Sequence, residues 1–218
     1  MGFNQKVIWD KMISLLFEVN QKDQVSELIK EFHYSGRPVN SINTFSWHFP
    51  RKSPWGEIPG DCVAGAVFSS PPTRWSEEVI ELLRLVRSEQ DGIPPLTGLL
   101  SESLKWLKRN TQHDLIVSFA DSTQGHHGGI YQAASWNFHG KRKRAMDGLI
   151  IDGTFVPGRT CNARYGTRSP SKLKDQRPDL DIEPHYDEGK YLYWKALNRN
   201  GKKKASRLML ESNEYVKE

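Results

Sequence analysis

The residues best suited to chemistry lie between positions 118 and 133, and the two most reactive side chains among them are Asp121 and Tyr131. Asp121 follows the almost wholly apolar run Asp114 to Ala120, which predicts a central strand covered on both faces. Ligands of open α/β sheets bind just beyond the carboxyl ends of such strands, where a carboxylate can accept a proton or a hydrogen bond from an amine. Tyr131 lies in a short predicted helix, Ile130 to Ser135, from which its hydroxyl can act as an acid or an orienting group.

Both residues also have a purely structural interpretation, because Asp121 can cap the turn that follows it and Tyr131 can fill the core. The loop between them is rich in glycine, which permits a positive φ or a close approach of a ligand to the backbone. A glycine-rich loop is a weak signal when it stands alone. We take three residues around it as candidate cofactor contacts: Ser118, Gly125 and Gly129.

Two adjacent histidines in the same loop, His126 and His127, raise the question of a metal site. Adjacent histidines in a loop seldom ligate one ion together, and neither a cysteine nor a third histidine stands at ligand spacing. The prediction is therefore that no metal binds, and the alternative is an iron ion held by these two side chains. The two cysteines, Cys62 and Cys161, are far apart and are expected to be free thiols in a reducing cytoplasm.

A second group of candidates lies upstream, on a strand predicted over residues 79–88 and a helix predicted over Thr97 to Asn110. Arg84 interrupts the apolar residues of that strand, and a charge there is costly unless it is paired or exposed at a pocket. It therefore either pairs with a neighbouring glutamate or contacts an anionic substrate. Thr97 is expected to cap the helix, and amides at its start can hold a diphosphate or another anion, which makes candidates of Leu96, Thr97 and Gly98.

The charge of the chain points to a polyanionic partner, since its formal net charge is +5 and its pI is about 9.1. Three basic groups fall in the last third of the chain: Lys141-Arg142-Lys143-Arg144; Arg159, Arg164 and Arg168; and Lys202-Lys203-Lys204 with Arg207. Aromatic residues are interleaved with them, namely Tyr165, Tyr191, Tyr193 and Trp194, and this combination favours a nucleic-acid surface over ordinary solvated faces. The absence of a long apolar run predicts no membrane span, and the first residues do not resemble a signal peptide.

These residues must be positioned by strands and helices, and the order of the predicted strands and helices along the chain indicates an α/β or α+β domain with a mixed sheet flanked by helices. Apolar spacing predicts, besides the elements above, a helix over Gln21 to Phe32, strands over Asn43 to Phe49 and Asp61 to Ser69, and a strand-like stretch over Lys190 to Leu197. Pro50 to Gly60 is interpreted as a Pro/Gly-rich excursion between two strands. We expect one domain over residues 1–218, in which residues 140–218 are a basic C-terminal extension that contacts DNA.

Three stretches together resemble the phage Mom family. The first is His33-Tyr34-Ser35-Gly36 at the end of a helix, and the second is Leu83-Arg84-Leu85 followed by the helix that contains Ser101. The third and most specific runs from Ser118-Phe119-Ala120-Asp121 through Gly125 to Gly129-Ile130-Tyr131-Gln132-Ala133. Gly158-Arg159-Thr160 and Gly189-Lys190-Tyr191-Leu192-Tyr193 resemble its C-terminal signature, so the resemblance spans roughly residues 25 to 200.

The resemblance implies an enzyme that modifies adenine in DNA with a carbamoylmethyl (acetamido) group and so protects phage DNA from host restriction. It also implies a fold similar to GNAT acetyltransferases, with a sheet splayed between two parallel strands, at 79–88 and 114–120, and an acyl donor in the splay. The residues that match those on which the family relies are Arg84, Asp121, Tyr131 and either Ser101 or Ser103. Asp121 would accept from the adenine amine, and Tyr131 would protonate or stabilise the leaving group.

The resemblance leaves the donor open. The GNAT diphosphate motif is absent where Asp91 to Gly98 stands, so an aminoacyl-tRNA that supplies glycine is the alternative to acetyl-coenzyme A. The target base must leave the duplex, and Phe119, Trp136 or Tyr34 is expected to stack on it. The expected partners are double-stranded DNA, the donor and a second copy of the chain in a possible homodimer. The expected location is the cytoplasm of the bacterial host. The predicted DNA contacts are Tyr34, Lys141, Arg142, Lys143, Arg144, Arg159, Arg164 and Arg168.

Two other functions fit parts of the sequence. A GNAT N-acetyltransferase acting on a small amine or a protein would keep the fold and the donor, but it would have no need of the basic and aromatic C-terminal third. A DNA-binding module without catalysis would use that surface, but it would leave the pair of Asp121 and Tyr131 unexplained.

Overall fold

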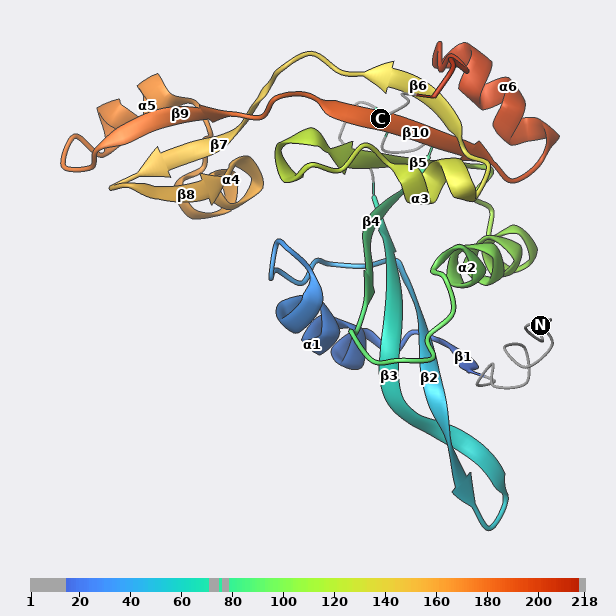
Figure 1. Cartoon of the computed structure of the whole chain (residues 1–218). Helices are drawn as coiled ribbons and strands as arrows, with labels where there is room; N and C mark the ends of the chain where they lie inside the picture. Colours follow the sequence, from blue (N-terminus) through green and yellow to red (C-terminus); the bar gives the residue numbers. More distant parts are fainter. Residues whose placement is uncertain (1–14, 71–74, 76–78, 216–218) are drawn as a thin grey trace, which may run out of the picture. The chain divides into compact units, whose positions relative to one another are not determined.

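The computed structural model describes residues 15–70, 75 and 79–215 and contains a seven-stranded mixed sheet (Figure 1). The strand order is β1-β2-β3-β4-β5-β10-β6. Their bounds are β1 Leu16–Val19, β2 Asn43–Ser53, β3 Gly56–Ser69, β4 Ile80–Arg87, β5 Leu115–Asp121, β10 Lys190–Ala196 and β6 Asn137–Lys141. A second sheet has three strands in the order β8-β7-β9, with bounds β7 Met146–Ile151, β8 Thr154–Pro157 and β9 Ile182–Tyr186.

The chain divides into two units. The first consists of the chain up to Phe119, Gly128–His139 and the chain from Tyr193, and the second consists of Ala120–His127 and Gly140–Leu192. The helices of the first unit are α1 Lys22–Phe32, α2 Thr97–Asn110, α3 Gly129–Ala133 and α6 Arg199–Arg207. Those of the second are the short 3-10 helix η4 Ser122–Gln124, α4 Gly158–Tyr165 and α5 Pro170–Gln176. Each unit is described by itself below.

The central pair of strands, β4 and β5, is parallel and separates towards its carboxyl end. The pairing runs from Ile80 opposite Ile116 to Leu82 opposite Ser118, although β4 continues to Arg87. The pairs β1/β2, β2/β3 and β3/β4 are antiparallel, so β4/β5 makes the sheet mixed. The predicted mixed sheet, splayed between two central parallel strands, is therefore confirmed.

Two amphipathic helices pack on this sheet as their apolar spacing predicts. On α1, Val25, Leu28 and Ile29 are buried and join a cluster with Val67 and Val86. The packing is close because a Cβ at Gly65 of β3 would lie 2.6 Å from Cγ1 of Val25.

The helix α2 buries its apolar stripe, but it begins differently from the prediction. Leu96 is the N-cap residue, no side chain caps the helix, and Thr97 is the first helical residue rather than the cap. The reason is local, because the chain already has helical dihedral angles at Leu96 and the amide of Gly98 donates to the Pro95 carbonyl at 3.0 Å.

The segment Pro50 to Gly60 is a paired β-arm, which corrects its interpretation as an excursion between strands. The register shifts on both sides of His48, but β2 and β3 stay paired beyond it, with Pro50 opposite Pro59, Arg51 opposite Ile58 and Ser53 opposite Gly56. β1 pairs β2 only at Phe45–His48, and β4 pairs β3 only at Ala64–Ser69. The end of the hairpin therefore has no third strand, and Figure 1 shows it extending beyond β1 and β4.

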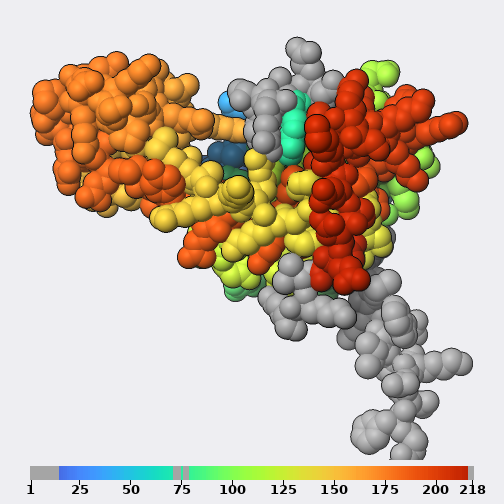
Figure 2. Space-filling model, turned by 90° about the horizontal axis from the view of Figure 1, so that it is seen from above, coloured from blue at the N-terminus to red at the C-terminus, as the bar shows by residue number. Residues whose placement is uncertain are grey.

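The second unit contains its own small core, where the sequence analysis predicted a basic C-terminal extension without naming a core. The helices α4 and α5 and the strands β7, β8 and β9 form one body, drawn mainly in orange in Figure 2. The buried residues of this core are Leu149, Ile151, Val156, Cys161, Leu173 and Ile182. Residues 193–215 belong to the first unit, so the described part of the predicted extension at 140–218 is distributed over both units.

Candidate active site

The hydroxyl group of Tyr131 lies where the ladder between β4 and β5 ends. Oγ of Ser118 is 2.7 Å from the Tyr131 hydroxyl and 2.8 Å from the backbone carbonyl of Leu82, and Leu82 and Ser118 form the last pair of the ladder. Because a serine carries one hydroxyl proton and a carbonyl only accepts, Tyr131 donates to Ser118 whenever Ser118 donates to Leu82. This gives a short chain of hydrogen bonds at the splay of the sheet.

The surroundings of Tyr131 keep its hydroxyl protonated. Burial raises the pKa of Tyr131 to about 12, against the lowering effect of the Ser118 hydrogen bond, and interactions with Tyr34, Glu81 and Tyr193 raise this pKa as well. The Tyr131 ring packs against Trp136 and Tyr193, at centroid distances of 5.2 and 5.0 Å. Tyr131 therefore combines a core position with a phenol that holds its proton at neutral pH.

The first unit thus brings together parts of the three stretches that carry the family resemblance. Tyr34, at the end of the first stretch, lies within electrostatic range of the Tyr131 hydroxyl, and so does Glu81 of β4. Tyr34 is 55% exposed, and its ring lies against that of His33 at a centroid distance of 4.3 Å. The exposed ring of Tyr34 suits the contact with DNA that the sequence predicts.

The two candidate serines on α2 have different surroundings. Ser103 is fully buried, and its hydroxyl donates to the Leu99 carbonyl of the same helix at 2.7 Å. Ser101 is exposed. Because the proton of Ser103 is used within the helix, Ser101 is the serine that remains available to a substrate.

The start of α2 is occupied by packing with β2. A Cβ at Gly98 would lie 2.7 Å from Cη2 of Trp47, and the indole of Trp47 donates to Glu102 at 2.6 Å. The close contact with Trp47 explains why residue 98 is glycine without any ligand. Leu96 and Thr97 are partly exposed, so their place as cofactor contacts stays a prediction.

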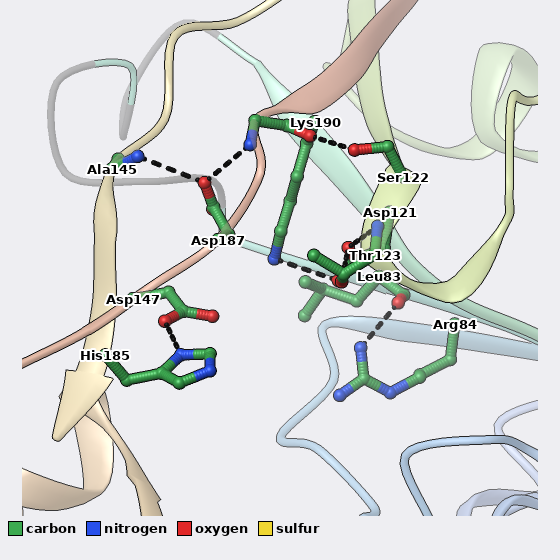
Figure 3. Close-up of polar contacts among 11 residues, drawn as sticks. Leu83, Arg84, Asp121, Ser122, Thr123, Ala145, Asp147, His185, Asp187 and Lys190 are labelled. Carbon is green, nitrogen blue, oxygen red and sulfur yellow. Dashed lines mark hydrogen bonds and ion pairs between the residues drawn. The ribbon is translucent and has the colours of Figure 1, made fainter. Parts of the chain in front are cut away.

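Arg84 is half-buried in the middle of β4, opposite Val67 of β3. Its guanidinium group turns back and donates to the backbone carbonyl of the preceding residue, Leu83, at 2.8 Å (Figure 3). This contact belongs to the part of β4 beyond the end of its ladder with β5, where a guanidinium group can meet an anionic or carbonyl group of a substrate.

Asp121 ends β5 in the second unit, and its carboxylate makes two kinds of contact (Figure 3). It is the N-cap of η4, accepting hydrogen bonds from the backbone amide of Thr123 at 3.1 Å and from the Thr123 hydroxyl. It also pairs with Lys190, whose Nζ lies 3.4 Å from Oδ2. Burial raises the pKa of this carboxyl, but the Thr123 hydrogen bonds and the charge of Lys190 together lower the pKa by more than burial raises it. The pKa therefore lies below its usual value.

A backbone clamp around Gly189 holds Lys190 beside Asp121, and sequence reasoning did not find it. The Ser122 hydroxyl donates to the Gly189 carbonyl at 2.6 Å, and the Gly189 amide donates to the buried carboxylate of Asp187 at 2.9 Å (Figure 3). Gly189 has φ +84°, and a Cβ there would lie 2.0 Å from the Arg142 carbonyl. Only glycine fits this position. The sequence marked Gly189-Lys190 as part of the C-terminal signature, but it did not indicate a contact with Asp121 or with Asp187.

Gly128 of the glycine-rich loop has a packing role that the sequence did not indicate. A Cβ at Gly128, which has φ +92°, would lie 2.3 Å from the Tyr193 ring, so this glycine permits packing next to Tyr131. Gly125 has φ +69° and ends η4, and space around it is open. Gly129 is the first residue of α3. Gly125 therefore has open space beside its backbone for a ligand.

His126 and His127 do not meet further ligands in the described part of the chain. Over residues 15–70, 75 and 79–215, no three or more His, Cys, Asp and Glu side chains are placed to hold a metal ion together. Cys62 and Cys161 are free, as expected, and burial raises the pKa of both thiols, that of Cys62 to about 11.

The basic residues among the predicted DNA contacts all lie in the second unit, whereas Tyr34 lies in the first. Arg159 and Arg164 are exposed on α4, and Arg168 is exposed just after it. Lys141 lies over the Tyr191 ring at 5.5 Å from its centroid, and Arg144 lies over the Tyr186 ring at 4.9 Å. Lys143 is exposed and Arg142 is half-buried. Cation and aromatic pairs of this kind can present both charge and a stacking face to a nucleic acid.

The interleaved aromatic residues are not all on that surface, which corrects the prediction. Tyr193 is fully buried and Trp194 is 9% exposed, because β10 is covered on both faces in the first unit. Trp136, proposed to stack on the target base, is also fully buried. Phe119 is half-buried and stacks on Trp75 at a centroid distance of 6.4 Å. Tyr186, which is 43% exposed, was not predicted.

A mixed sheet that splits between the parallel strands β4 and β5, with a tyrosine hydroxyl at the split, defines the class of the protein as α/β with a splayed mixed sheet. The chain belongs to the Mom protein family, whose model matches residues 14–217. A search of curated proteins finds no match.

Two solved structures resemble the chain over most of its length. An N-acetyltransferase from Staphylococcus aureus is 10% identical, with a TM-score of 0.45, over 84% of this chain and 98% of the other. A GNAT-family N-acetyltransferase from Escherichia coli in complex with coenzyme A is 11% identical, with a TM-score of 0.46, over 87% of this chain and 84% of the other. Within the described residues, no helix is long and apolar enough to cross a membrane.

Proposed function

We propose that this protein converts adenine in double-stranded DNA to its carbamoylmethyl derivative and so protects phage DNA from host restriction. The observation that carries the proposal is the match to the Mom family over residues 14–217, together with Tyr131 and Ser118 at the split of the sheet. In the proposed reaction, N6 of adenine forms a new bond to carbon and loses one proton, and the leaving group of the donor gains one.

Asp121 is proposed to accept the hydrogen of the adenine amine. This amine is a poor nucleophile because its lone pair is delocalised into the ring, so a negative acceptor raises its electron density as it attacks. Lys190 supports this role as a positioning residue, because its charge keeps the carboxylate ionised and in place. Arg84 and Ser101 are proposed to contact the donor or the base.

Tyr131 is proposed to protonate the leaving group. A pKa of about 12 means that the phenol carries its proton at neutral pH. Once Tyr131 has given its proton away, Ser118 can turn its own hydroxyl from the Leu82 carbonyl to the phenolate, since both acceptors are within 2.8 Å. This switch would stabilise the phenolate at the moment of transfer.

Between the two proposed donors, atom balance favours glycine carried by an aminoacyl-tRNA over acetyl-coenzyme A. A glycyl group contains the same atoms as a carbamoylmethyl group, so a glycyl adenine and a carbamoylmethyl adenine are isomers. Their interconversion needs neither an oxidant nor a second nitrogen source. An acetyl group lacks the nitrogen.

The proposed function is tested by weighing nucleosides. DNA from cells that express the protein should contain an adenine nucleoside heavier by a carbamoylmethyl group, and DNA from cells without it should not. Because the glycyl adduct has the same mass, fragmentation of this nucleoside should show a terminal amide rather than a terminal amine. Growth with glycine labelled at both carbons and the nitrogen should add the mass of every label if the glycyl donor is right. An acetyl increment would support the coenzyme A donor, and unmodified adenine would reject the reaction.

Duplex DNA is proposed to bind along the basic surface of the second unit. Replacing Lys141, Arg142, Lys143 and Arg144 by Gln should weaken binding and lower the slope of log affinity against log salt concentration by roughly 0.9 for each phosphate that the protein no longer neutralises. Binding can be followed by fluorescence anisotropy of a labelled duplex at several salt concentrations. Replacing exposed Lys105 and Lys108 of α2 gives a control for loss of charge. An unchanged slope in the 141–144 variant would remove this block from the surface.

A further inference from the structure

Trp55, at the tip of the arm formed by β2 and β3, is the most exposed large apolar residue in the described part of the chain. Its side chain is 95% exposed, and it takes no part in the proposed reaction. A tryptophan has a large apolar face that is poorly hydrated, so soluble proteins seldom present one fully to water without a partner that covers it.

The arm presents Trp55 on a fixed turn rather than on a loose loop. The Ser53 hydroxyl donates to the Gly56 carbonyl at 2.7 Å and accepts from the Trp55 amide at 3.3 Å. Gly56 has φ +118°, a value that favours glycine, and so closes the turn. Since Ser53 also pairs with Gly56 in the ladder, the position of Trp55 is set by the end of the hairpin.

The residues next to Trp55 indicate the chemistry of its partner. Arg51 and Lys52 are both exposed on the arm, and successive strand residues point to opposite faces, so one cation lies on each face. Glu57, opposite Lys52, is the only acidic residue between positions 50 and 60. An aromatic face with cations on both sides complements a stacked base flanked by phosphates.

We propose that this arm contacts duplex DNA, with Trp55 stacking on a base and with Arg51 and Lys52 at the neighbouring phosphates. The inference rests on the proposed function, because it takes DNA as the substrate, and it assigns to the first unit a DNA contact in addition to the one predicted at Tyr34. Apolar side chains inserted at a base step unstack it, and an enzyme that modifies a base must take that base out of the stack. Trp55 at the end of a two-stranded arm has the reach and the shape for such a wedge.

Three variants of the full-length protein separate stacking from charge. Trp55→Ala should weaken binding to a short duplex about tenfold or more at every salt concentration, because stacking is worth about that much, and should leave the salt slope unchanged. Trp55→Phe should restore most of the affinity, because it restores an aromatic face. The double change Arg51→Gln with Lys52→Gln should lower the salt slope by roughly 2, one phosphate for each cation.

Met209→Ala is the matched control, since Met209 is 80% exposed and lies away from the arm in sequence. It should change neither the affinity nor the slope. If wild-type protein binds DNA and Trp55→Ala binds equally well, the inference is wrong while the proposed function stands. If Trp55→Ala instead abolishes self-association in sedimentation and spares DNA binding, the arm joins two copies of the chain. If wild-type protein binds no DNA at low salt, the proposed function fails and the inference with it.

Discussion

Replacing Asp121 by Asn is expected to lower the yield of modified adenine by about a hundredfold or more, the usual effect of removing a positioned base. Asn has the same shape and is an equally good N-cap, so the Thr123 amide keeps its acceptor. The change removes the negative charge that would act on the adenine amine. The yield is measured by weighing nucleosides from cells that express each variant, and the melting temperature should stay within a few degrees, as for changes of about 0.5 kcal/mol.

Two further variants control this result. Asp147→Asn removes another carboxylate of the second unit that pairs with a basic side chain, His185, at 2.7 Å, and should leave the yield unchanged. Lys190→Met should raise the pKa of Asp121, because it removes a charge that lowers it, so Asp121 would become protonated at a higher pH. An NMR titration of the Asp121 carboxyl would detect this shift. If Asp121→Asn kept full activity, or lost stability and activity in proportion, Asp121 would be a cap only.

Replacing Tyr131 by Phe is also expected to reduce modification about a hundredfold, because it deletes the proposed acid. The ring would stay in its place between Trp136 and Tyr193, and Ser118 would keep the Leu82 carbonyl as its acceptor. The Ser118 hydroxyl therefore still has a partner, so the cost in stability should be small. Nucleoside weighing and thermal unfolding of the same preparation measure the two effects.

Tyr193→Phe provides the matched comparison for Tyr131→Phe. Tyr193 is a buried tyrosine of the same cluster, and its hydroxyl accepts a hydrogen bond from the Gln132 side chain at 3.1 Å. Loss of this hydroxyl should change stability as much as Tyr131→Phe does and should leave modification nearly intact. Equal losses of activity in both variants would mean that the Tyr131 hydroxyl matters only through packing.

The elements around the splay could be predicted because their apolar patterns are strong. Residues 115–121 form a run covered on both faces, and α2 shows a buried stripe with helical spacing. The sequence therefore indicates both the kind of each element and its position in the chain. The parallel pairing of β4 and β5 came from the family resemblance rather than from any pattern, since pairing direction depends on contacts between distant residues.

The second unit could not be predicted because its core is assembled from single apolar residues spread over short elements. Leu149, Val156 and Leu173 lie on three different elements, and the residues between them are polar. The arm was missed for another reason, since Pro50 and Pro59 normally mark loops. Prolines are tolerated there because the outer side of each strand has no hydrogen-bonding neighbour.

The sequence predicted individual residues of the site, but it did not predict the contacts that support them. Asp121 and Tyr131 stand out by type and position, but their contact partners, Lys190 for Asp121 and Ser118 for Tyr131, were not assigned those roles. Tyr193 was placed on the surface because aromatic residues between basic groups suggest nucleic-acid binding. Its burial shows that the same pattern arises when a core strand runs through a basic region.

The arm of β2 and β3 also bears on how this protein stays in solution. Both of its strands are edges, and an exposed edge can recruit strands from other molecules and start aggregation. Pro50 and Pro59, opposite each other, have no amide hydrogen to offer to an incoming strand, and the charges of Arg51, Lys52 and Glu57 disfavour its approach. The arm can therefore carry a fully exposed tryptophan at its tip while its sides remain poor templates for β-aggregation.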